Sequence, residues 1–86
     1  MLIFEYTKKY PIEPTSLIND APGHYVNISS DNVFSIRGEA FSYAKRYLPV
    51  NIYNPNMYSI NIDVDGSDYI IEKYGTMRFE WITDLR

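Results

Sequence analysis

Hydrophobic and polar residues alternate in two short stretches of the N-terminal third of the chain, which is the pattern of β-strands with one buried face. In residues 2–7 every second side chain, from Leu2 to Tyr6, is apolar or aromatic. Residues 24–28 are rich in residue types that favour strands, among them Tyr25 and Val26. We therefore predict one strand in each stretch.

The segment between these two strands, residues 8–23, is predicted to be a long loop because three prolines interrupt it. A connection of this length in a compact domain is either functional or contains an unrecognised element. We expect Leu17 and Ile18 to hold the loop against the core.

Apolar residues at three- and four-residue spacing over residues 37–48 predict the main helix, which Pro49 ends. The start of this helix is open. A longer helix capped by Asp31 is one alternative, and a short strand over residues 33–36 that pairs with residues 24–28 is the other. The shorter helix is preferred, with a start near residue 35, because Gly38 costs about 1 kcal/mol in a helix interior.

Residues 49–56 hold two prolines and three asparagines, and this composition predicts a loop. Apolar and polar residues alternate in residues 57–64, and after Asp65-Gly66 the chain is predicted to return as an antiparallel strand over residues 67–74. Asp-Gly favours the left-handed conformations of a tight hairpin turn. A two-residue loop pairs Ile62 with Tyr69 and Ile60 with Ile71.

A last strand over residues 76–82 presents Met77, Phe79 and Trp81 on one face. A three-residue loop with Gly75 in the left-handed position would pair Ile71 with Phe79 and Tyr69 with Trp81, which gives one continuous apolar face. On the opposite face, Glu72 and Glu80 flank Arg78, and this pattern predicts a cross-strand salt bridge.

Together these elements predict a single domain over residues 1–86 of the α+β class. Its two layers are one main helix, at about 37–48, and a mostly antiparallel sheet with a C-terminal three-stranded meander, in the order β-β-α-β-β-β. A chain of 86 residues has room for one core of this kind.

Charge and composition narrow the function. Eight Lys and Arg stand against 11 Asp and Glu, and this net charge of −3 disfavours generic nucleic-acid binding. The absence of cysteine from the sequence excludes disulfides, thiolate metal sites and cysteine nucleophiles. Glu5 interrupts the N-terminal apolar run, unlike a signal peptide, and no apolar run reaches the ~20 residues of a membrane span. We expect a cytoplasmic protein that does not contact membranes.

No constellation of residues indicates catalysis, so we expect neither an enzyme nor a cofactor. His24 is the only histidine, and no nucleophile or second acid can be paired with it from the sequence. The spacing of Asp63, Asp65 and Asp68 resembles a calcium loop superficially, but Gly66 is misplaced and Tyr74 stands where the bidentate Glu belongs. No metal site is predicted.

Nine tyrosines and an acidic hairpin favour protein binding instead. The expected partner is another protein with a basic surface. The candidate contact residues are Asp63, Asp65, Asp68, Glu72, Ile70, Tyr74, Ile82 and Tyr53.

In composition alone, this small, acidic, cysteine-free domain resembles the inhibitor and immunity or antitoxin proteins of phages and bacteria, and no motif carries the resemblance. It implies an inhibitor that blocks a basic or nucleic-acid-binding surface of its target. Two alternatives stay open. One is a structural protein that self-associates through its outer sheet face or an edge strand. The other is a small-ligand-binding protein with a pocket near His24 and residues 8–23.

Overall fold

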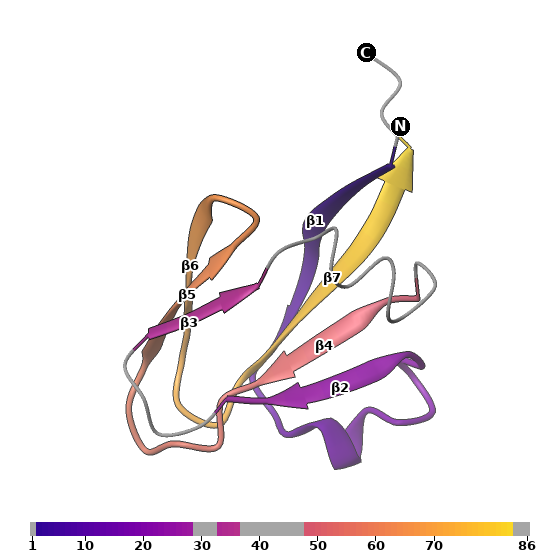
Figure 1. The fold of residues 1–86 in the computed structure, drawn as a ribbon. Helices are drawn as coiled ribbons and strands as arrows, with labels where there is room; N and C mark the ends of the chain where they lie inside the picture. The colour runs from indigo at the N-terminus through magenta and orange to yellow at the C-terminus, as the bar shows by residue number, and fades with distance from the viewer. Residues whose placement is uncertain (1, 29–32, 37–47, 84–86) are drawn as a thin grey trace.

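A computed structural model describes residues 2–28, 33–36 and 48–83 of the chain. Its regular structure is almost entirely β-strand (Figure 1). The strands are β1 (Leu2–Tyr10), β2 (His24–Asn27), β3 (Val33–Ile36), β4 (Val50–Tyr53), β5 (Ile60–Val64), β6 (Ser67–Ile71) and β7 (Thr76–Thr83). A single turn of 3-10 helix, η1 (Pro14–Ser16), interrupts the connection between β1 and β2.

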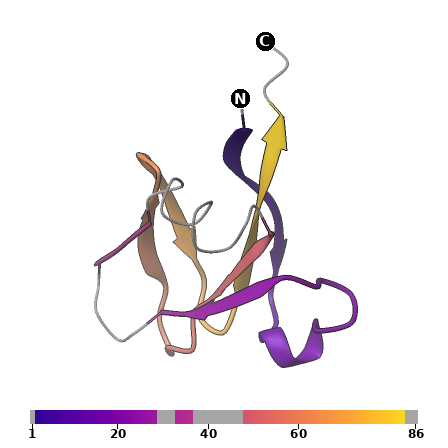
Figure 2. The ribbon, with the colours of Figure 1, turned by 45° about the vertical axis from the view of Figure 1, so that its right-hand side comes forward.

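The strands form two sheets that face each other. One sheet has the order β1-β7-β4-β2, and the other has the order β3-β5-β6. Figure 2 shows the β5–β6 hairpin in one layer and β1, β7 and β4 in the other. A pair of sheets buries one face of each against the other, which is the arrangement of a β-sandwich.

The predicted α+β class is therefore wrong. Within the described residues there is no α-helix, and strands supply both layers. The main helix predicted at 37–48 lies, apart from Leu48, outside the described residues. Both layers of the core are sheets because the apolar residues of β4 and β7 face those of β5 and β6, so no helix is needed to cover them.

The loop predicted over residues 49–56 is also wrong, because it contains β4, an inner strand of the four-stranded sheet. Val50 and Ile52 are fully buried on its core side. Asn51, which lies between them and suggested a loop, is fully buried on the other side. Prolines bound this strand without entering it, so its ladder of hydrogen bonds is intact.

The predicted hairpin is confirmed in its register. Ile60 pairs with Ile71 and Ile62 with Tyr69, in antiparallel order. Both residues of the connecting turn have positive φ, 52° at Asp65 and 92° at Gly66, as the tight turn requires.

The C-terminal meander is wrong, because β7 leaves the sheet of the hairpin. It pairs with β1, where Phe4 is opposite Trp81, and with β4, where Val50 is opposite Phe79. The left-handed residue in the preceding turn is Tyr74, with φ 57°, and not Gly75. Because β7 belongs to the four-stranded sheet, its apolar face lies across the core from the apolar face of β6. The two faces bury each other there.

The alternative of a short strand over residues 33–36 is confirmed, but the strand predicted to pair with it is wrong. These residues form β3, which pairs in parallel with β5 and not with residues 24–28. The strand at 24–27 pairs in parallel with β4 instead. Each sheet thus joins strands that are far apart in sequence.

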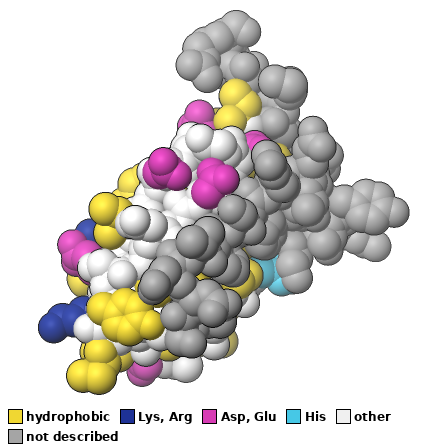
Figure 3. Space-filling view, turned by 60° about the vertical axis from the view of Figure 1, so that its left-hand side comes forward, with side chains coloured by type: hydrophobic (Ala, Val, Ile, Leu, Met, Phe, Trp, Pro, Cys, Tyr) yellow, Lys and Arg dark blue, Asp and Glu magenta, His cyan; other side chains and the backbone are white. Residues whose placement is uncertain are grey.

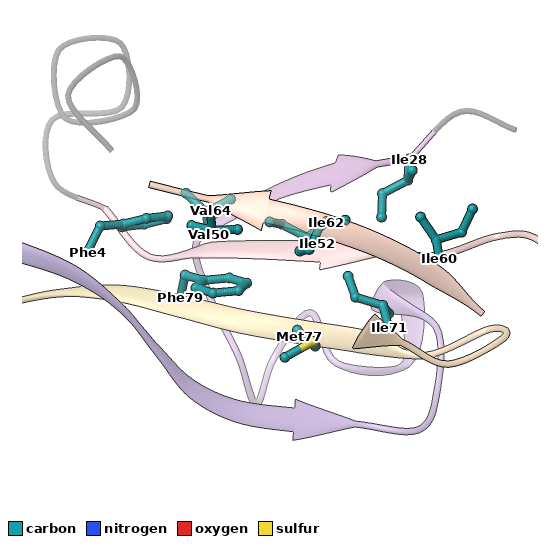
Figure 4. Packing of buried hydrophobic residues seen from close by; sticks show 10 residues of the cluster. All are labelled: Phe4, Ile28, Val50, Ile52, Ile60, Ile62, Val64, Ile71, Met77 and Phe79. Carbon is teal, nitrogen blue, oxygen red and sulfur yellow. The ribbon is translucent and has the colours of Figure 1, made fainter. Parts of the chain in front are cut away.

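The core between the sheets combines aliphatic side chains with the rings of Phe4 and Phe79 (Figure 4). The Phe79 ring lies 5.5 Å from the ring of Phe4 and 5.1 Å from that of Tyr69, centroid to centroid. Trp81 is partly buried and packs on Phe4. The fully or nearly buried members are Phe4, Ile28, Val50, Ile52, Ile60, Ile62, Val64, Ile71, Met77 and Phe79.

The segment predicted as the long loop 8–23 has two parts. Its first three residues extend β1, and the rest covers the outer face of the four-stranded sheet. Thr76 Oγ1 donates a hydrogen bond to the Ile12 carbonyl oxygen at 2.8 Å, and Arg78 Nη1 donates one to that of Pro22 at 3.0 Å. Leu17 is buried as expected, whereas Ile18 is 62% exposed.

Candidate functional site

The outer side of the β5–β6 hairpin carries the acidic residues that the sequence singled out. Asp63 of β5 lies directly opposite Asp68 of β6, and Asn61 lies opposite Ile70. Asp65 occupies the turn between the two strands. We call these five residues the hairpin face. Figure 3 shows several acidic side chains in the upper half of this side of the molecule, and further acidic side chains lie lower, where the Lys and Arg side chains in view also lie.

The charges of the hairpin face are not neutralised within the described part of the chain. Asp63 Oδ1 accepts a hydrogen bond from the Gly66 main-chain N–H at 3.0 Å, and this contact fixes the carboxylate over the turn. The ion pairs among residues 2–28, 33–36 and 48–83 join other groups. Like charges directly opposite each other in a sheet are destabilising, so this arrangement lowers the stability of the hairpin.

An exposed isoleucine lies beside the acids. Ile70 is 60% exposed on the outer side of β6. It lies two residues along the strand from Asp68, which is paired with Asp63. A single exposed apolar residue is ordinary on a protein surface. Here its neighbours give the face both an apolar and a negatively charged part.

Glu72, also predicted as a contact residue, follows β6 and forms an ion pair instead. Its Oε1 lies 2.8 Å from Nζ of Lys9 on β1. This pair joins the two sheets at their β1 and β6 edges. The predicted salt bridge between Glu72 and Arg78 is wrong, because Arg78 Nε donates to Glu80 Oε1 at 2.7 Å on its own strand.

The structure does not bring the other three predicted residues to the hairpin face. Ile82 lies on β7 of the opposite sheet, where it pairs with Ile3. Tyr74 is 44% exposed in the turn before β7. Tyr53 is partly buried on β4. Ile82 was expected beside the acids because residues 76–82 were predicted to pair with residues 67–74, and that pairing is wrong. Tyr53 was expected in an exposed loop, and β4 occupies that position instead.

Tyr53 instead lines a groove on the outer side of the four-stranded sheet. The groove has a volume of about 310 Å³ and is lined by Glu13, Pro14, Thr15, Ile18, Tyr25, Asn27 and Tyr53. Burial raises the pKa of Tyr53 above its ordinary value, and the nearby Glu13 and Tyr74 raise it further. Neither Glu13 nor Tyr25 was predicted at this site, because their proximity depends on how residues 11–23 fold back onto the sheet.

His24 begins β2, and its main-chain N–H donates to the Pro49 carbonyl oxygen at 2.8 Å. The hollow beside it is lined by Pro22, Gly23, Leu48, Pro49 and Arg78. Among the described residues no group of three or more His, Cys, Asp or Glu side chains is placed to hold a metal ion.

Comparisons with protein-family models, with curated proteins and with solved structures give no match for this chain. Within the described ranges, no helix is long and apolar enough to cross a bilayer. Because the comparisons give no match, a proposal for the function of this protein rests on the chemistry of its surface.

Proposed function

We propose that this protein is a non-enzymatic protein-binding module whose hairpin face contacts a basic surface of a partner protein. The observation that carries the proposal is the direct cross-strand pairing of Asp63 with Asp68, beside the exposed Ile70. A partner that supplies Lys or Arg side chains compensates the repulsion between the two carboxylates. This compensation stabilises the complex relative to the free hairpin.

A second pair of like charges in the same molecule supports this interpretation by contrast. Glu5 and Glu80 are directly opposite each other on β1 and β7. There, the guanidinium of Arg78 lies against Glu80 at 2.7 Å and compensates the negative charge. The chain thus neutralises one such pair internally, while the described residues provide no cation for the pair on the hairpin.

Ile70 gives the proposed interface an apolar contact next to its charges. Charged groups at the rim of an interface mainly accelerate association and select the partner, while buried apolar contacts provide much of the affinity. The net charge of −3 acts in the same direction at long range, because it attracts a basic partner before contact.

Within this class, we propose an inhibitor that works in the cytoplasm and covers a basic or nucleic-acid-binding surface of its target. An acidic face that imitates the charge of a phosphate backbone competes with nucleic acid for such a surface. A cysteine-free chain suits a reducing compartment.

Affinity capture from a lysate of the protein's own host tests the proposal. The variant carries Asp63→Asn and Asp68→Asn, which keep side-chain shape and leave an oxygen at position 63 for the Gly66 N–H. The matched control carries Glu5→Gln and Asp20→Asn, which change the net charge equally at residues that do not belong to the hairpin face. Capture is read by mass spectrometry at low and high salt.

We expect one stoichiometric partner that the wild type and the control retain and that the hairpin variant binds at least about tenfold more weakly. Added salt should weaken the wild-type complex as well. Equal capture by all three proteins contradicts the proposal. Recovery of the protein alone also contradicts it and favours self-association, which sedimentation at several concentrations then measures.

A further inference from the structure

We propose that the groove lined by Tyr25 and Tyr53 is a second binding site, which takes an arginine or lysine side chain presented by a peptide segment. It lies on the outer side of the four-stranded sheet, so it is separate from the hairpin face and does not depend on it. Three features carry the inference: two aromatic walls, a fixed opposite wall, and a carboxylate at the rim.

The aromatic walls come from neighbouring parallel strands. Tyr25 pairs with Asn51, and Asn27 pairs with Tyr53. The two tyrosines are therefore on adjacent strands, offset by two residues, and on the same side of the sheet. The Tyr25 hydroxyl donates a hydrogen bond to the Ala21 carbonyl oxygen. This bond fixes the ring in place before any ligand arrives, which reduces the entropy lost on binding.

The opposite wall is the turn that contains η1, and hydrogen bonds hold it to the sheet and to itself. The Leu17 main-chain N–H donates to the Pro14 carbonyl oxygen at 2.8 Å, and Thr76 Oγ1 holds the preceding residue Ile12. Leu17 anchors the turn with a buried side chain. Its neighbour Ile18 is directed to the groove and is largely exposed there.

Glu13 gives the groove its charge preference. It lines the cavity beside Pro14, and the ion pairs of the described residues do not include it. Burial is the largest cause of the raised pKa of Tyr53, and the negative charge of Glu13 is the second. Glu13 is therefore close enough to act on the Tyr53 hydroxyl electrostatically. A cation in the groove is therefore stabilised, whereas a neutral apolar ligand would cover the carboxylate without compensation.

Arginine and lysine match this combination of groups. Their aliphatic stems lie on apolar surface while the charged end stays polar, and their cations are attracted to the faces of tyrosine rings. A volume of about 310 Å³ is at the small end of ligand pockets, which suits one long side chain and not a large cofactor.

An NMR titration of the ¹⁵N-labelled protein tests the proposal with three small probes: N-acetyl-arginine methylamide, N-acetyl-lysine methylamide and the neutral N-acetyl-norleucine methylamide. The amide signals of Thr15, Asn27 and Tyr53 report on the groove. The variant is Glu13→Gln, an exposed and nearly isosteric change that leaves the fold intact. The control is Glu5→Gln, which makes the same change of charge outside the groove.

We expect saturable millimolar binding of both cationic probes, with the norleucine probe binding about threefold or more weakly. Glu13→Gln should remove this preference for the cation, while Glu5→Gln and the double variant Asp63→Asn/Asp68→Asn keep it. Equal binding of all three probes, or no saturable shift of the groove signals, overturns the proposal. Because the hairpin variant is expected to bind normally here, failure at one site is distinguishable from failure at the other.

Discussion

The side-chain Nδ2 of Asn54 donates a hydrogen bond of 3.0 Å to the main-chain carbonyl oxygen of Ile71, 17 residues further along the chain. The same amide nitrogen also lies within hydrogen-bonding distance of the carbonyl oxygens of Tyr58 and Glu72. Its Oδ1 accepts from the main-chain N–H of Asn56. One buried side chain thus joins the end of β4 in the first sheet to the end of β6 in the second.

We expect Asn54→Ala to lower the free energy of unfolding by about 2–4 kcal/mol, because buried carbonyl groups lose their donor. Urea unfolding followed by tryptophan fluorescence measures this change. Asn61→Ala, at an exposed position of β5, should change stability by less than about 0.5 kcal/mol. Equal effects of the two substitutions would show that Asn54 does not join the sheets.

Phe79→Ala should destabilise the protein by about 3–5 kcal/mol, because Phe79 is fully buried and contacts three other aromatic rings. A domain of this size has little stability beyond that, so we expect this variant to be largely unfolded at 25 °C by near-UV circular dichroism. Ile70→Ala, on the exposed hairpin face, should keep the wild-type spectrum and midpoint.

Gly23→Ala and Gly66→Ala compare two glycines with positive φ, 144° and 92°. A Cβ at position 23 would lie 2.6 Å from the Pro49 carbonyl oxygen, whereas a Cβ at position 66 has no neighbour within 4 Å. Gly66→Ala therefore carries only the conformational cost, about 1–2 kcal/mol. Gly23→Ala should cost clearly more, and thermal unfolding of both variants measures the difference. A smaller loss at position 23 would contradict the close approach.

Asp68→Asn should stabilise the protein, by roughly 0.2–1 kcal/mol at low ionic strength, because it removes one of two carboxylates in direct cross-strand register. The gain should shrink in 0.5 M NaCl, where screening weakens the repulsion in the wild type. Asp20→Asn, which makes the same change of charge in an exposed turn, should give a smaller gain. A loss of stability in Asp68→Asn would show that the hairpin needs this carboxylate.

Tyr53 makes stability depend on alkaline pH. Its pKa is higher in the folded protein than in the unfolded chain because burial, then Glu13 and then Tyr74, oppose the phenolate. The stabilising contribution is complete below the ordinary tyrosine pKa of about 10 and is lost as pH rises through the higher folded value. The urea midpoint should therefore fall more between pH 8 and a pH above 10 for the wild type than for Tyr53→Phe.

The hairpin was predictable from sequence because its determinants are local. Alternation fixed the inward positions Ile60 and Ile62, and Asp65-Gly66 fixed the turn and hence the register. The placement of Asp63 opposite Asp68 follows from that register alone. The acidic part of the candidate site therefore needed no knowledge of the rest of the fold.

The strand at 50–53 was not predictable in the same way, because two asparagines in or next to it are buried. Asn51 is acceptable there only because the carbonyl oxygens of Ala21 and His24 lie within hydrogen-bonding distance of its amide nitrogen. These groups come from a segment about 30 residues earlier. Hydrophobic periodicity carries no information about such partners.

The position of β7 was missed for a related reason. A return beside β6 needs only a short turn, and the sequence alone favours pairing between consecutive strands. The actual partners of β7 are β1 and β4, so its apolar residues meet Ile71 across the core and not along one sheet. Residues 8–23 were expected to border a possible ligand pocket, and they supply one wall of the groove. The other wall, at Tyr25 and Tyr53, could not be predicted because it depends on the pairing of β2 with β4.

The pairing of β1 with β7, from Leu2 opposite Thr83 to Tyr10 opposite Thr76, governs how the protein assembles during synthesis. At ~5–20 residues per second, a ribosome completes β7 several seconds after β1. During that interval the four-stranded sheet lacks the strand that joins β1 to β4 and β2. Formation of the four-stranded sheet therefore waits until translation has passed β7, and β1 is the strand of this sheet that a chaperone has the longest time to bind.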